Sequence, residues 1–82
     1  MTNPLIMQLK IKETALSKKV QELKIKIARL VNELSVYIST YYGDADEIDA
    51  EKIKQIGDEL LETKTELTDY SEKLKKVQKE LK

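Results

Sequence analysis

Apolar residues recur every three or four positions along almost the whole chain, and this spacing constrains the fold more than any other feature. Positions a and d of a heptad repeat form the contact stripe of a helix, and the first half of the chain fills both positions continuously. This pattern predicts one long amphipathic helix, with Glu13 as the only charged member of its stripe. The stripe consists of Ile6, Leu9, Glu13, Leu16, Val20, Leu23, Ile27, Leu30, Leu34, Tyr37 and Tyr41.

A second stripe with the same spacing occupies the other half of the chain, and Thr63 is its one weakly apolar member. Its positions are Ile53, Ile56, Leu60, Thr63, Leu67, Tyr70, Leu74, Val77 and Leu81. The two stripes are out of phase, because Tyr41 and Ile53 are both a positions and lie twelve residues apart. Twelve is neither a multiple of seven nor one of the three- or four-residue shifts that coiled coils tolerate. The sequence therefore predicts two helices rather than one.

The segment between the stripes contains residues that end and begin helices. Gly43 suits the left-handed conformation that follows the end of a helix, and Asp49 suits an N-cap. At the start of the chain, Asn3 and Pro4 suit the N-cap and the first helical position. We therefore predict an all-α, single-domain chain over residues 1–82, with a first helix over about 4–42, a loop over about 43–48 and a second helix over about 49–82.

Two long helices joined by a short loop pack as antiparallel neighbours, so we expect a two-helix coiled-coil hairpin. Folding the sequence about the loop places every a position opposite a d position when the paired residue numbers sum to 90. In this register Lys26 can reach Glu59 or Glu66. Lys19 faces Lys73, which is a conflict of like charges unless Lys19 leans toward Glu66.

The residue types present favour a protein that performs no bond chemistry. The chain has neither Cys nor His, so the usual zinc ligands, a thiolate nucleophile and the commonest general base are absent. The acidic segment that begins at Asp44 resembles the start of an EF-hand loop, but Asp49 stands where that loop requires Gly and Gln55 where it requires Glu. We expect no catalytic residues, no cofactor and no metal site, and we expect Glu13 to reach water near the open end of the hairpin.

The apolar segments are too short for a membrane span, which needs roughly 18 consecutive apolar residues. The first ten residues, MTNPLIMQLK, also lack the early positive charge and the small-residue cleavage site of a secretory signal. We therefore expect a soluble, cytoplasmic protein that does not bind membranes.

The first helix carries a second apolar set outside its stripe, at Met7, Ile11, Ile25, Ala28 and Val36. A helix with two apolar surfaces packs against more than one neighbour, so these five residues predict a partner-binding face. We expect a homodimer in which two hairpins form a four-helix bundle, with contact to another helical protein as the alternative use of this face. The corresponding function is that of a structural or adaptor protein, of the scaffold, chaperone or assembly-factor type.

Two further surfaces are alternatives to that face. Tyr41 and Tyr42 lie beside the acidic loop and can either pack over the end of the hairpin or contact a partner at its tip. The first helix is also basic, since residues 1–42 contain seven Lys and Arg against three Glu. The seven are Lys10, Lys12, Lys18, Lys19, Lys24, Lys26 and Arg29, and they make nucleic-acid binding the alternative, less favoured function.

Overall fold

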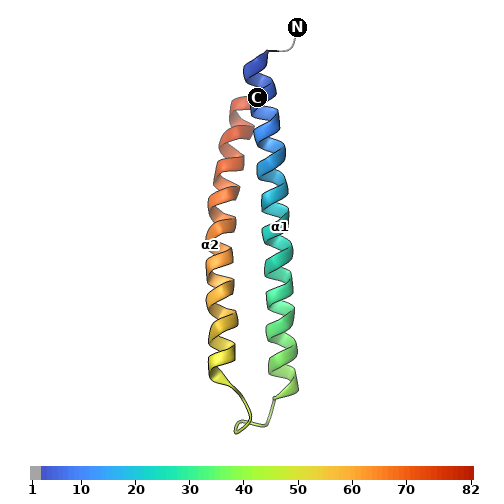
Figure 1. Ribbon diagram of the computed structural model, residues 1–82, viewed down its shortest axis with the longest axis vertical. Coiled ribbons are helices and arrows are strands. Elements are labelled where there is room, and N and C mark those ends of the chain that lie inside the picture. Colours follow the sequence, from blue (N-terminus) through green and yellow to red (C-terminus); the bar gives the residue numbers. More distant parts are fainter. Residues whose placement is uncertain (1–2) are drawn as a thin grey trace.

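The computed structural model describes residues 3–82, and within them two helices form an antiparallel hairpin (Figure 1). Helix α1 covers Pro4–Thr40 and helix α2 covers Ala50–Leu81. The Cα atoms span 68 × 15 × 15 Å, so the molecule is a rod only two helices wide. The predicted helical hairpin is therefore confirmed. Figure 1 also shows that the first turns of α1 extend beyond the C-terminal end of α2.

Both helices begin at the N-caps that the sequence predicts. The side chain of Asn3 accepts a hydrogen bond from the backbone N–H of Leu5 at 2.9 Å, and Pro4 is the first helical residue. The carboxylate of Asp49 accepts from the N–H of Glu51 at 3.0 Å. Each cap satisfies N–H groups that have no partner inside the helix, which stabilises a helix by about 1 kcal/mol.

The loop begins two residues earlier than the sequence predicts, because a tight turn ends α1 at Thr40. The carbonyl of Tyr41 accepts a hydrogen bond from the N–H of Asp44 at 3.0 Å, and Gly43, the third residue of that turn, has φ +85°. A positive φ at this position is the mark of a type II turn, which glycine adopts without steric cost. Gly43 thus has the predicted left-handed conformation, but within a turn rather than directly after the helix.

The core of the hairpin is the seam formed by the two heptad stripes. Six of its residues are buried, and they are Val20, Leu23, Leu30, Ile56, Thr63 and Val77. The remaining seam residues are partly buried, except Ile6, which is 43% exposed. Ile6 belongs to the first turn of α1, and the first turns of α1 extend beyond the end of α2 (Figure 1).

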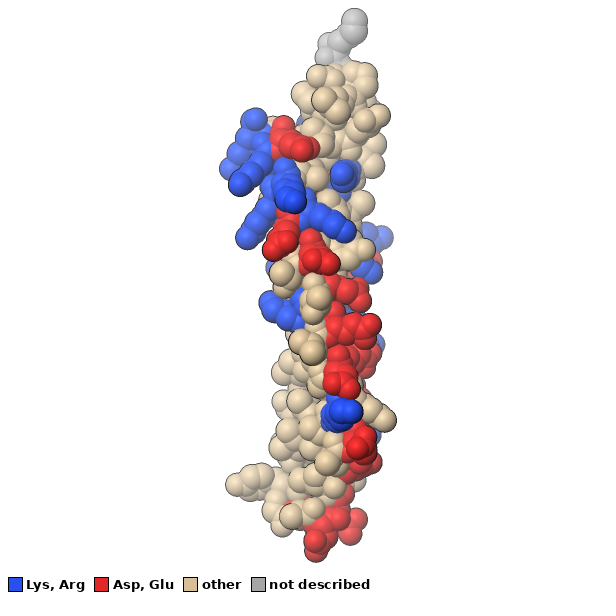
Figure 2. Space-filling model, turned by 90° about the vertical axis from the view of Figure 1, so that its left-hand side faces the viewer, with Lys and Arg blue, Asp and Glu red and all other residues tan. Residues whose placement is uncertain are grey.

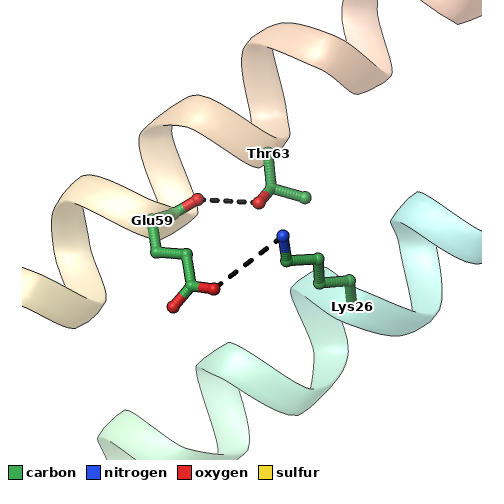
Figure 3. A network of polar contacts seen from close by, with 3 residues as sticks. All are labelled: Lys26, Glu59 and Thr63. Carbon is green, nitrogen blue, oxygen red and sulfur yellow. Dashed lines mark hydrogen bonds and ion pairs between the residues drawn. The ribbon is translucent and has the colours of Figure 1, made fainter.

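Thr63, the weakest member of the predicted seam, is fully buried at 1% exposure. Its hydroxyl donates a hydrogen bond to the carbonyl of Glu59 at 2.7 Å, so no polar atom is left without a partner at this position (Figure 3). Across the seam, the ammonium of Lys26 lies 3.8 Å from a carboxylate oxygen of Glu59, which is one of the predicted ion pairs. Both charged side chains remain well exposed, so the pair contributes only about 0 to 1 kcal/mol.

Two contacts between the helices report the register. The ammonium of Lys19 lies 5.7 Å from the centre of the Tyr70 ring, and that of Lys52 lies 5.2 Å from the centre of the Tyr37 ring. Lys19 directly precedes Val20 and Lys52 directly precedes Ile53, and these are the residues that the predicted register places opposite Tyr70 and Tyr37, so both contacts agree with that register. Lys73 also lies over the Tyr70 ring, at 5.0 Å. The conflict between Lys19 and Lys73 is thus moderated by an aromatic ring that attracts both ammonium groups, not by Glu66.

Candidate interaction surface

The five residues of the predicted partner-binding face are all exposed on α1. Four of them, Met7, Ile11, Ile25 and Val36, have exposures of 51 to 68%, and we call these four the outer stripe. With 3.6 residues per turn, the four positions lie within about 40° of one another around the helix axis. Ala28 lies about 70° to one side of their line by the same geometry, so it borders the outer stripe rather than continuing it.

The outer stripe lies on the side of α1 that is turned away from α2. Its line is about 160° around the helix from the mean direction of the buried residues Val20, Leu23 and Leu30. Helix α1 therefore has two apolar surfaces on nearly opposite sides, and α2 covers only one of them.

Helix α2 has no comparable second surface among the residues described. Leu61 is its one large apolar side chain with high exposure, at 69%. An isolated exposed leucine is normal on a protein surface, whereas the four residues of the outer stripe share one side of α1 along its length. The exposed apolar surface of the hairpin opposite the seam therefore lies mainly on α1.

A shallow, open depression follows the outer stripe near the open end of the hairpin. It is lined by Lys10, Ile11, Thr14, Ala15 and Lys18. Ala15 was not among the residues predicted to bind a partner. Its small side chain follows Ile11 by four positions, so both lie on one side of the helix and a neighbouring side chain can approach over Ala15. In the sequence, this depression is marked by a small residue four positions after an exposed apolar one.

The two tyrosines near the loop have different environments. The ring of Tyr41 is partly buried and lies 4.9 Å from the ring of Tyr37, with 51° between the ring planes. The hydroxyl of Tyr37 accepts a hydrogen bond from the N–H of Asp49 at 2.8 Å, which ties the end of α1 to the start of α2. Tyr41 therefore packs over the end of the hairpin, and Tyr42, at 87% exposure, is the tyrosine that a partner could reach.

The seven basic residues of α1 do not share one face. At 3.6 residues per turn, Lys24 and Lys26 lie about 160° apart, and the other five are distributed between and beyond them. Two of the seven also have contacts within the hairpin, since Lys19 lies over Tyr70 and Lys26 pairs with Glu59. This distribution differs from the continuous basic face that a helix uses to follow a phosphate backbone.

Glu13 is partly buried and lines two open depressions beside the seam. The neighbouring ammonium groups that line them include those of Lys18, Lys75 and Lys79. Because both depressions are open to solvent, they offer no enclosed space in which a carboxylate could be kept from water. The arrangement is that of a solvated charge beside opposite charges.

Within residues 3–82, no three acidic side chains lie close enough together to hold a metal ion. Neither helix of the described chain has a stretch that is both long and apolar enough to cross a lipid bilayer. Comparisons of the chain with protein-family models, with curated proteins and with solved structures found no match.

Proposed function

We propose that this chain is a non-enzymatic structural or adaptor protein that acts through helix-mediated association, with the outer stripe of α1 as its contact surface. The chain forms a homodimer of two hairpins, with four helices in total. Its expected location is the cytoplasm. Such an assembly acts as a scaffold, a chaperone or an assembly factor by presenting a rigid rod to other proteins.

The observation that carries this proposal is the uncovered second apolar surface of α1. A helix that packs against one neighbour needs only the a and d positions, and these already face α2. The outer stripe is additional to that seam and exposes Met7, Ile11, Ile25 and Val36 to water. Burying such a side chain fully stabilises an association by about 1.5 to 3 kcal/mol, so a second helix on this surface gains several such contributions.

A pair of matched substitutions tests the role of the outer stripe. Ile25 and Leu61 are 68% and 69% exposed, but only Ile25 belongs to the stripe. We expect Ile25→Lys to weaken dimerisation by about 30- to 1,000-fold. Burying the 68% of Ile25 that is still exposed contributes about 1 to 2 kcal/mol, and a two-fold dimer loses this contact twice, or about 2 to 4 kcal/mol in total. Leu61→Lys should leave the dissociation constant within about three-fold of the unmodified value, since surface substitutions usually change free energies by less than about 0.5 kcal/mol.

Sedimentation velocity over a concentration series measures both dissociation constants, and circular dichroism verifies that each variant keeps its helical content. Equal weakening by the two substitutions would show that general surface charge, and not the outer stripe, controls association.

The alternative function, nucleic-acid binding through α1, makes a different prediction. A protein that neutralises several phosphates loses affinity steeply as salt rises, because counterions are released on binding. Titration of a DNA or RNA duplex at two salt concentrations separates the two functions. We expect weak binding without a steep salt dependence, because the seven basic residues are distributed around α1 and two of them have partners within the hairpin.

A further inference from the structure

The hairpin separates charge along its length. The open half, residues 3–26 and 64–82, carries twelve Lys against six Asp and Glu, for a net charge of +6. The loop half, residues 27–63, carries three Lys and Arg against nine Asp and Glu, for a net charge of −6. Figure 2 shows this on the face it presents, where Lys side chains gather toward the open end and acidic side chains extend down to the loop. The chain is neutral overall, yet the rod is positive toward its open end and negative toward its loop.

Opposite charges also lie close together near the middle of the outer stripe. The stripe extends from Met7 to Val36, so its midpoint falls between residues 21 and 22. Lys18 lies on the line of the stripe and Glu22 lies about 50° to one side of it, at 3.6 residues per turn. The two opposite charges thus lie close together near the midpoint of the stripe, and Arg29 is a further charge on its line.

We infer that the second copy binds antiparallel to the first, outer stripe against outer stripe, with the two-fold axis crossing α1 level with residue 20, midway between Lys18 and Glu22. This inference rests on the proposed homodimer and specifies its geometry. In the antiparallel orientation Lys18 faces the partner's Glu22, and the reciprocal pair forms across the axis. Each rod is positive toward its open end and negative toward its loop, so two rods side by side attract each other more when they run in opposite directions, which favours this orientation during encounter.

A parallel dimer on the same surface has the opposite electrostatics. Lys18 then faces its own counterpart, as does Arg29, and halves of the same net charge lie side by side. Because like charges in direct opposition disfavour an interface, the charge distribution selects the antiparallel form.

The position of the outer stripe also determines how the four helices are arranged. The stripe and the seam lie about 160° apart on α1, whereas the faces that a helix uses in a square bundle are closer to a right angle apart. The two α1 helices therefore pack side by side in the middle, and each α2 lies on the outside. The dimer is a row of four helices rather than a square four-helix bundle.

Spin labels measure the orientation directly, because the chain contains no Cys and single cysteines can be introduced without background. Gln21 and Ser39 are both exposed and lie at the same angle around α1, since 18 residues make about five full turns. In the antiparallel dimer the labels of Gln21→Cys lie beside the axis, within about 20 Å of each other, because packed helices are about 8 to 10 Å apart. The labels of Ser39→Cys lie about 55 to 60 Å apart, at about 1.5 Å per residue.

The possible results separate the inference from the proposed function. A short distance for Gln21→Cys with a long one for Ser39→Cys supports the antiparallel dimer. Equal short distances for the two variants would keep the homodimer and overturn the orientation. The absence of any distance between molecules, in samples at high micromolar concentration that retain their helical content, would overturn the homodimer itself and leave the outer stripe to a different protein.

A charge exchange provides a second test that needs no label. We expect Lys18→Glu alone to weaken dimerisation roughly 3- to 30-fold, because two attractive pairs become repulsive, and we expect the double variant Lys18→Glu with Glu22→Lys to recover the original dissociation constant. In a parallel dimer Lys18→Glu replaces one pair of like charges by another, so an unchanged dissociation constant would overturn the inference.

Discussion

At the scale of single residues, the two glycines have opposite roles. Gly43 has φ +85° in the turn that ends α1, whereas Gly57 lies inside α2 with helical neighbours on both sides. A Cβ atom added at either position would have no other atom within 4 Å, so packing does not distinguish the two sites. The two sites differ only in backbone conformation, so the same substitution at both positions tests the effect of that conformation alone.

We predict that Gly43→Ala lowers the free energy of unfolding by about 1 to 2 kcal/mol, because a Cβ atom disfavours the left-handed conformation. Gly57→Ala should raise it by about 1 kcal/mol, because alanine has the higher helix propensity and restricts the unfolded chain. Urea denaturation followed by circular dichroism at one fixed protein concentration measures both. Stabilisation by Gly43→Ala would contradict the turn described here.

At the scale of the helices, the heptad pattern predicted the core well for a physical reason. A repeat of three and four residues keeps one stripe facing one partner over the whole helix, so burial follows directly from spacing. At Thr63 the heptad position predicts burial although the residue type does not, because threonine is only weakly apolar and is nevertheless buried. Its hydroxyl bonds to a carbonyl of its own helix, and that local partner makes the burial tolerable.

Replacement of Thr63 by valine tests this explanation. The carbonyl of Glu59 is also the normal acceptor for the backbone N–H four residues later in a helix, so losing the hydroxyl leaves no acceptor without a partner. We predict that Thr63→Val raises the free energy of unfolding by about 0.5 to 1 kcal/mol, because a methyl group replaces a hydroxyl in the apolar seam. Thr65, whose hydroxyl bonds to the carbonyl of Leu61 at 2.9 Å on the exposed surface, is the matched control.

Thr65→Val should change stability by less than about 0.5 kcal/mol, as exposed substitutions usually do. Thermal and urea denaturation of both variants provide the comparison. A clear loss of stability in Thr63→Val would mean that the buried hydroxyl stabilises the seam rather than being merely tolerated in it.

The end of α1 and the contacts of Lys19 could not be predicted from spacing. The carbonyl of Tyr41 accepts a hydrogen bond from the N–H of Asp44, three residues later, so the chain turns at Gly43 and the helix ends at Thr40. The spacing of apolar residues does not predict this backbone hydrogen bond. Pairing of charges by register predicted repulsion between Lys19 and Lys73. It did not anticipate that the ring of Tyr70, an apolar seam residue by its position, would lie near both ammonium groups.

At the scale of the whole molecule, the sequence predicted which residues form the candidate surface but not its geometry. The surplus of apolar residues outside the heptad stripe selected Met7, Ile11, Ile25, Ala28 and Val36, and of these Ala28 lies to one side of the line of the other four. Their alignment opposite the seam follows from helical geometry once the seam is known to face α2. The charge separation into a +6 half and a −6 half is visible only after the chain is folded about its loop, because each half combines segments that are far apart in sequence.

The most direct test of the central claim, that hairpins associate through the uncovered surface of α1, is sedimentation equilibrium of the unmodified chain from low micromolar to millimolar concentration. We expect the weight-average mass to rise to about twice the 9.5 kDa of one chain and to remain there at the highest concentrations. A mass of 9.5 kDa throughout that range would contradict the account.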